Sequence, residues 1–289
     1  MRPLQGDGNG VVPALTFVGA GVGVGVMSGL LGVGGGVALV PILVLLLHFQ
    51  QKNAQATSLA AIVLTALSGA LFYGLAGEVL LLPAAIVAIG GLVGAVVGGG
   101  LLHRLSENTM RYVFAVLLLI VAGRLLWPTA AAAVAGEVST SGPLVIAGYL
   151  FAGLAMGVLS ALLGVGGGVI LVPAFMLGFG MSPQEAQGTS LAVMVPVSLM
   201  GAWRNARHGY TDWRAGAWLG AGGIAGAPLG VQLALILPAE WMSRLFALFL
   251  LFSAVQLLRR ARKSAAPPAT TSDGTDSSHG GEHGEQAAT

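Results

Sequence analysis

Residues 25–41, GVMSGLLGVGGGVALVP, decide the fold, because the stretch returns at residues 157–173 as GVLSALLGVGGGVILVP with 14 of 17 positions identical. A shift of 132 residues brings the two halves of the chain into register without a gap. Along the same register, residues 54–60 (AQATSLA) match residues 186–192 (AQGTSLA). This agreement indicates an internal duplication, which predicts two structurally equivalent units.

The composition places these units in a membrane. Of the 289 residues, 55% are hydrophobic and 8% are charged, and the mean hydropathy is +0.86. Soluble domains carry roughly a quarter charged residues, whereas several apolar runs here approach the ~20 residues that span a bilayer as a helix. The runs are continuously apolar rather than alternating, which disfavours a transmembrane β-barrel. We therefore predict an all-α polytopic membrane protein.

Each half divides into five apolar segments. In the first membrane repeat, residues 11–127, the segments cover about 11–31, 37–49, 54–76, 79–102 and 110–127. In the second repeat, residues 143–258, they cover about 143–163, 169–180, 186–203, 213–237 and 241–258. The second segment of each half follows the glycines and reaches only ~20 Å as a helix, against a hydrocarbon core of ~30 Å. The sequence predicts 8–10 transmembrane segments and leaves open whether these short helices span or re-enter.

The loop charges predict how the two repeats are oriented. An odd number of crossings per half inverts the second repeat relative to the first, and the basic loops then fall on one side. They contain Lys52, His103, Arg104, Arg111, Arg204, Arg207, Arg214 and the run from Arg259 to Lys263. Because lysine and arginine favour cytoplasmic loops, both termini are expected in the cytoplasm. Residues 128–142 are expected to link the repeats, and residues 264–289 to form a disordered cytoplasmic tail.

The glycine runs are the first candidate binding site. Three consecutive glycines do not share one helix face, so they indicate a break in the helix. Close helix packing is the alternative, and its usual four-residue spacing occurs elsewhere, at Gly90, Gly94, Gly98 and at Gly222, Gly226, Gly230. Uncovered amides at a helix N-terminus suit a small oxyanion. The candidate residues are Gly34, Gly35, Gly36, Gly166, Gly167 and Gly168.

Hydroxyl pairs that follow each short segment form the second candidate. They are Thr57 with Ser58, and Thr189 with Ser190. These side chains can donate to a bound anion, or they can cap a helix or bond a carbonyl one turn earlier; the sequence leaves both interpretations open. The glutamine two residues before each threonine also recurs. The second copy has Gly188 where the first has Ala56, which predicts unequal contributions from the two halves.

Other kinds of chemistry have no candidate residues. No Asp or Glu lies inside an apolar segment, no cysteine is present, and no nucleophile-and-base motif is found. The two histidines of the tail, His279 and His283, are a weak metal signal, and the basic residues are too few and dispersed for a nucleic-acid surface. We therefore expect no enzyme activity, no cofactor, no metal and no nucleic-acid partner.

The motif LLGVGGGVxLVP followed by AxxTSL, present in both halves, resembles the TauE/SafE family of sulfite-exporter-like permeases. The resemblance covers nearly all of residues 11–260. It implies a bacterial inner-membrane permease for small sulfur-containing anions such as sulfite or organosulfonates, with the glycines and hydroxyls above as substrate contacts. The repeats favour alternating access between two inverted halves. A passive anion channel and a non-transporting membrane scaffold or assembly protein remain alternatives, and association as a homo-oligomer stays open.

Overall fold

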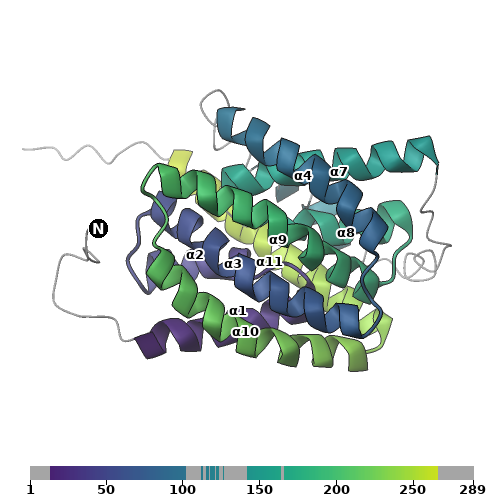
Figure 1. Ribbon diagram of the computed structural model, residues 1–289, viewed down its shortest axis with the longest axis horizontal. Coiled ribbons are helices and arrows are strands. Elements are labelled where there is room, and N and C mark those ends of the chain that lie inside the picture. Colours follow the sequence, from purple (N-terminus) through teal and green to yellow (C-terminus); the bar gives the residue numbers. More distant parts are fainter. Residues whose placement is uncertain are drawn as a thin grey trace, which may run out of the picture.

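The computed structural model describes residues 14–101, 142–163 and 166–265, together with residues 112, 115, 116, 118–120, 122, 123 and 126. Every regular element in this part of the chain is an α-helix, as expected (Figure 1). The first half contains α1 (Ala14–Leu31), α2 (Gly36–Leu45), α3 (Gln51–Leu75) and α4 (Leu81–Leu101). The second half contains α7 (Pro143–Leu163), α8 (Gly168–Phe179), α9 (Pro183–Arg207), α10 (Trp213–Ile236) and α11 (Ala239–Ala265).

The helices follow the predicted segments closely. Within the described residues, five are long and apolar enough to cross a membrane, namely Ala14–Leu31, Lys52–Leu75, Leu81–Gly98, Pro143–Ala161 and Trp213–Ile236. The two short helices have 10 and 12 residues, so each rises only ~15–18 Å. α11 continues to Ala265, past the predicted end, because Leu, Arg and Lys after residue 256 are good helix formers. The predicted segment 110–127 is only partly described, and the linker and the tail beyond residue 265 lie outside the described residues.

Local sequence signals explain where the second half's helices begin. The Ser182 hydroxyl accepts a hydrogen bond from the Glu185 amide at 3.2 Å, and the Glu185 carboxylate accepts one from the Ser182 amide at 2.8 Å. This reciprocal capping box, with Pro183 at the first helical position, starts α9. The Asp212 carboxylate starts α10 by accepting from the Ala215 amide at 3.0 Å.

α3 and α9 form the centre of the bundle and run antiparallel. A Cβ on Gly201 of α9 would lie 3.0 Å from a methyl group of Leu59, and one on Gly69 of α3 would lie 2.7 Å from a methyl group of Leu191. α10 packs on α3 and α1 packs on α10, whereas α4 packs on α9 and α7 packs on α4 (Figure 1). The short helices α2 and α8 lie against α3 and α9, respectively. Each half thus contributes one central helix and one short helix packed on it.

Glycines at four-residue spacing bring the outer helices together, as the packing interpretation predicted. Those of α10 face the backbone of Val18, Val22 and Val26 in α1, in that order along the chain. Those of α4 face the backbone of Leu150, Leu154 and Val158 in α7. A Cβ would collide with a backbone carbonyl in most of these places, so only glycine permits this spacing. In both contacts the residue numbers of the two helices rise in the same direction, so α1 runs parallel to α10 and α4 runs parallel to α7.

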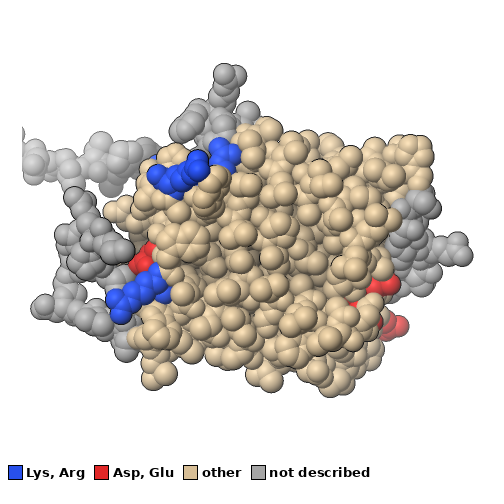
Figure 2. Space-filling model, viewed as in Figure 1, with Lys and Arg blue, Asp and Glu red and all other residues tan. Residues whose placement is uncertain are grey.

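Charged residues lie at the two ends of the bundle. The Lys52 ammonium lies 5.9 Å from the centre of the Tyr210 ring, so the start of α3 and the end of α9 share one end. At the opposite end, burial raises the pKa of Glu78 above its usual range, and the nearby charge of Glu185 raises it further. Figure 2 shows Lys and Arg at one end of the molecule, Asp and Glu mainly at the other, and uncharged surface between them.

Candidate functional site

The first glycine run breaks the helix where the sequence predicted a break. α1 ends at Leu31, and Gly32, Gly34 and Gly35 take the left-handed conformation with φ of 68°, 68° and 75°. α2 then begins at Gly36, and its N-cap, Gly35, contributes no side-chain hydrogen bond. Because the first amides of a helix have no intrahelical acceptor, this turn presents backbone N–H groups that no side-chain cap covers.

The second glycine run repeats this geometry in its described part. Gly166 and Gly167 have φ of 79° and 81°, and α8 begins at Gly168 without a side-chain cap. Each half of the chain therefore contains a short helix whose N-terminus, with its partial positive charge, opens from a glycine turn. Glycine readily adopts the left-handed conformation, which is energetically costly for other residues.

The two glycine turns meet in the interior. A Cβ built on Gly168 would lie 2.8 Å from both the Gly32 carbonyl oxygen and the Val33 Cα. Gly34 and Gly166, one from each turn, both face the side chains of Ile62 and Met194. Since these two side chains come from the middle of α3 and α9, the turns lie near the mid-depth of the bundle.

Ile62 and Met194 are a pair that the sequence analysis missed. They occupy equivalent positions under the 132-residue shift, and both are fully buried. Together they cover one face of each glycine turn with apolar side chains. The only sequence signal for this role is their equivalence within the repeat, because isoleucine and methionine are common throughout membrane helices.

The predicted threonines lie apart from this centre and make the same contact in both halves. Thr57 Oγ1 accepts a hydrogen bond from the Asp212 amide at 3.1 Å, and Thr189 Oγ1 accepts one from the Leu80 amide at 3.0 Å. Leu80 and Asp212 are themselves equivalent positions, and each immediately precedes a long helix. The threonines thus anchor the loops before α4 and α10, and substrate contact by them stays a prediction.

The two serines differ from each other. Ser58 Oγ donates to the Gln55 carbonyl oxygen at 2.8 Å, which is the local backbone contact considered from the sequence. Ser190 Oγ lies 3.9 Å from Met194 Sδ, and that sulfur would be 2.8 Å from a Cβ on Gly168. Ser190 is therefore connected to the glycine turns through Met194, whereas Ser58 is tied to its own helix.

A buried polar cluster beside the first glycine turn is a further group that the sequence analysis did not select. Gln187 is fully buried, and a Cβ on Gly32 would lie 2.5–2.7 Å from its Cα, Cβ and Cγ. Tyr73 Oη lies 2.7 Å from Gln187 Oε1 and 2.8 Å from the Gly29 carbonyl oxygen, and its single proton bonds one of the two acceptors at a time. With Oε1 toward Tyr73, the amide nitrogen of Gln187 lies on the side away from it.

Two polar atoms of this cluster have no hydrogen-bond partner among the residues that the structure describes. They are Gln187 Nε2 and Ser28 Oγ, and both residues are at most 1% exposed. Ser28 lies on α1 beside Gly35. Leaving a buried donor unpaired costs roughly 1–3 kcal/mol, and both groups adjoin a turn with uncapped backbone amides. The recurrence of glutamine in the sequence pointed to this site, but only the packed structure shows that one of the two glutamines is buried.

Gly188, the noted departure between the repeats, has a steric explanation. A Cβ at this position would lie 2.5 Å from the Glu78 carbonyl oxygen and 2.8 Å from the Tyr73 Cβ. Glycine therefore lets Tyr73 approach α9 and reach Gln187. In the first half, the residue equivalent to Gly188 is Ala56, which is buried. In the second half, the residue equivalent to Tyr73 is Asn205. The polar cluster is consequently built on one side only.

Comparison with known proteins finds one family model and several relatives that match most of the chain. The family model described as "Sulfite exporter TauE/SafE" matches residues 2–125 and 149–284. A "Probable membrane transporter protein" of Xylella fastidiosa (strain 9a5c) is 28% identical over 250 residues, which cover 86% of this chain and 95% of the relative. The "Probable membrane transporter protein YdhB" of Bacillus subtilis (strain 168) is 26% identical over 214 residues, covering 74% and 87%. No solved structure matches the chain significantly.

Proposed function

The chain belongs to the TauE/SafE family of multi-pass membrane transporters, and from this premise we propose that it carries small sulfur-containing oxyanions, such as sulfite or organosulfonates, across a bacterial inner membrane. The observation that carries the proposal is the meeting of two uncapped helix N-termini at the centre of the bundle. Backbone amides at such positions bind oxyanions without a fixed cation.

The substrate contacts come mainly from the glycine turns. Amides from Gly34 to Gly36 and from Gly166 to Gly168 donate to the oxyanion. Gln187 Nε2 and Ser28 Oγ supply side-chain donors beside the first turn, which gives these two buried atoms the acceptor that they lack. Hydrogen bonds to a charged group contribute about 1.5–3 kcal/mol each, so a few such donors suffice for a small anion.

The transport mechanism is alternating access between inverted repeats. Its support is the direction of the helices: α1, α3 and α10 run one way, whereas their equivalents α7, α9 and α4 run the other way. The chain then has 8–10 transmembrane segments, with α2 and α8 running outward from mid-depth. Ile62 and Met194 cover one face of both turns, and movement of one half relative to the other displaces them.

The orientation follows from the charges. The end that carries Lys52, Arg204, Arg207 and Arg214 faces the cytoplasm, because lysine and arginine are retained there. α1 begins at this end and α11 finishes at it, so both termini are cytoplasmic. The opposite end carries Glu78 and Glu185 and faces the periplasm.

Flux measurements in proteoliposomes test the proposal. Wild type is expected to give saturable uptake of radiolabelled sulfite, with exchange against internal unlabelled sulfite. Gln187→Leu is expected to lower the uptake rate about tenfold or more, since one hydrogen bond to a charged group is lost. The matched control is Gln55→Leu, the equivalent residue in the other half, whose side chain is half-buried; its rate should stay within about twofold of wild type.

Three outcomes would contradict parts of this account. Flux that does not saturate and shows no exchange would indicate a passive channel. A correctly inserted protein without sulfite or sulfonate flux would favour a scaffold. Equal effects of the two glutamine substitutions would remove Gln187 from the binding site.

A further inference from the structure

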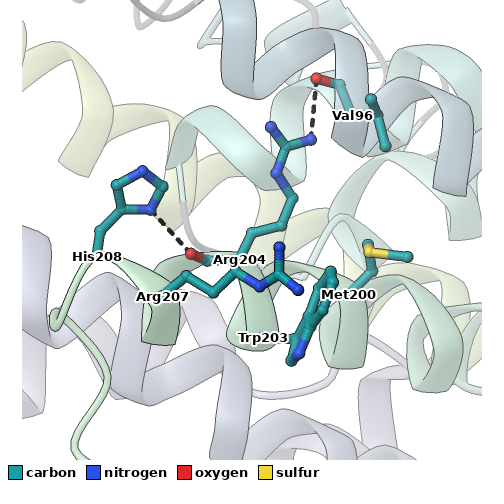
Figure 3. A pocket seen from close by; sticks show the side chains of 6 residues that line it. All are labelled: Val96, Met200, Trp203, Arg204, Arg207 and His208. Atoms are coloured by element: carbon teal, nitrogen blue, oxygen red, sulfur yellow. Dashed lines mark hydrogen bonds between the residues drawn. The ribbon is translucent and has the colours of Figure 1, made fainter.

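A second feature lies away from the glycine turns, at the C-terminal end of α9. A pocket of about 400 Å³ opens there between α9 and α4 (Figure 3). Its lining combines apolar and basic side chains, which are Val96, Met200, Trp203, Arg204, Arg207 and His208. None of these residues takes part in the site proposed for transport.

The apolar wall of the pocket lies on the lipid-facing surface. Val96 and Trp203 are 51% and 47% exposed, and the neighbouring Val93, Val97 and Leu199 are exposed to a similar extent. Val96 belongs to the last turn of the candidate span Leu81–Gly98. The pocket is therefore at the depth of a membrane interface, where tryptophan is enriched.

The basic side chains of the pocket are held in fixed positions. The Arg207 guanidinium lies over the Trp203 ring, with its central carbon 3.7 Å from the ring centre (Figure 3). Arg204 donates one N–H to the Val96 carbonyl oxygen at 3.2 Å, which ties α9 to α4; among the described residues, its other donors have no hydrogen-bond partner. His208 Nδ1 donates to the Arg204 carbonyl oxygen at 2.9 Å.

The charge of the two arginines is not compensated within the described chain. The salt bridge recorded between described residues joins Arg244 to Glu240 at the other end of the bundle, and none involves Arg204 or Arg207. The equivalent positions of the first half, at the end of α3, are Leu71, Phe72 and Leu75. The repeat architecture therefore does not require arginines at these positions.

We propose that this pocket binds an anionic phospholipid of the surrounding leaflet. The lipid phosphate is bound by the guanidinium groups of Arg204 and Arg207, whose planar donors match phosphate oxygens. The first part of an acyl chain lies against Val96, Met200 and Trp203. A topological preference for positive charge explains the presence of arginines, but it does not require a guanidinium stacked on tryptophan beside a lipid-exposed cavity.

Quenching of tryptophan fluorescence by brominated lipids tests this assignment on the full-length protein in vesicles. Brominated phosphatidylglycerol is compared with brominated phosphatidylcholine of the same acyl chains, and Trp203→Phe identifies the signal of Trp203. Wild type is expected to prefer the anionic lipid roughly fivefold per arginine contact. Arg207→Lys, which keeps the charge but not the planar donors, is expected to lower that preference by up to about fivefold. The control Arg214→Gln removes an exposed charge at the same end outside the pocket and should keep it.

The outcomes separate a lipid site from its alternatives. Equal quenching of Trp203 by the two lipids in wild type would overturn the proposal. An unchanged preference in Arg207→Lys would also overturn it, because charge alone would then explain the effect. So would a loss of preference in Arg214→Gln equal to that in Arg207→Lys. Displacement of the brominated lipid by millimolar glycerol phosphate would show that the pocket takes a free phosphate ester rather than a bilayer lipid.

Discussion

α3 and α9 are equivalent helices of the two halves, and they are alike at one end and different at the other. Near their starts, Thr57 and Thr189 make the same hydrogen bond to the loop that precedes a long helix. At their middles, Ile62 and Met194 cover both glycine turns. At their C-terminal ends, α3 has Leu71, Phe72 and Leu75, whereas α9 has Trp203, Arg204 and Arg207.

This difference separates the residues that hold the bundle together from the residues that face its surroundings. Contacts between the halves are kept in both copies, because each half needs the other to bury them. The C-terminal ends reach opposite ends of the bundle and therefore meet different environments. The polar cluster around Gln187 is an exception at the centre, since its partner Tyr73 has no equivalent in the second half.

The largest effect is expected from alanine at the two glycine N-caps. Gly35→Ala and Gly167→Ala each force a left-handed residue and a new contact, at a cost of roughly 2–4 kcal/mol of unfolding free energy. The added methyl meets Val24 at Gly35 and Met156 at Gly167. A methionine side chain changes rotamer easily, whereas a β-branched valine is restricted. Gly35→Ala should therefore lower the free energy of unfolding by about 1 kcal/mol more than Gly167→Ala does. Thermal unfolding of the purified variants in detergent measures this.

The matched control for this pair is Gly23→Ala on α1. A Cβ at Gly23 meets no other atom within 4 Å, so alanine there should leave stability unchanged or slightly raised. Equal losses in the two N-cap variants would show that Val24 and Met156 adapt to the same extent, and the proposed difference between the halves would be lost at this position.

A smaller effect is expected at the position where the repeat sequences depart. Gly188→Ala places a Cβ against the Glu78 carbonyl oxygen and Tyr73, and such overpacking costs roughly 1–3 kcal/mol. The reciprocal change, Ala56→Gly, should cost at most about 1 kcal/mol because it only loosens a helix. Comparing both unfolding temperatures with wild type measures the asymmetry. A tolerated alanine at position 188 would contradict the close approach of Tyr73.

The threonines should respond equally. Thr57→Val and Thr189→Val each remove the hydroxyl acceptor of one loop amide and should each cost about 1 kcal/mol. Serine at either position keeps the hydroxyl and should restore most of the loss. Unfolding in detergent, with sulfite flux measured in parallel, gives the comparison. Unequal losses would mean that the two hydrogen bonds do not contribute equally to stability.

The smallest effect concerns the loops at positions 78 and 210, where the first half has a carboxylate and the second has Tyr210. Burial and the charge of Glu185 raise the pKa of Glu78, so the folded state binds this proton more tightly than the unfolded state. Stability should therefore fall as pH rises from the unfolded pKa through the folded pKa of this group. Glu78→Gln should remove that dependence and stabilise the protein slightly at neutral pH.

Unfolding temperatures at several pH values measure this effect. Glu240→Gln removes an exposed carboxylate at the same end and serves as the control, so its pH profile should keep the slope assigned to Glu78. An identical change of slope in both variants would assign the pH dependence to the overall charge of that end rather than to Glu78.

Most of the fold could be predicted from the sequence because helix length and helix breaks are local properties. Apart from the end of α11, the apolar runs predicted the described helices within a few residues. The three-glycine runs predicted the breaks between α1 and α2 and between α7 and α8. The spacing of Gly222, Gly226 and Gly230 predicted a close helix contact. The same local signals did not reveal which helix would be the partner, since the α1–α10 contact joins segments about 200 residues apart.

The amino-acid sequence alone determined the membrane class, the duplication, the short glycine-led helices and the family. These follow from composition, periodicity and repetition, which need no knowledge of contacts. The tertiary structure alone decided that the two glycine turns meet, that Ile62 and Met194 both pack against them, and that Gln187 is buried there while its equivalent Gln55 is only half-buried. Such facts depend on which surfaces pack together over long sequence distances, and identical motifs acquire different surroundings when their neighbours differ.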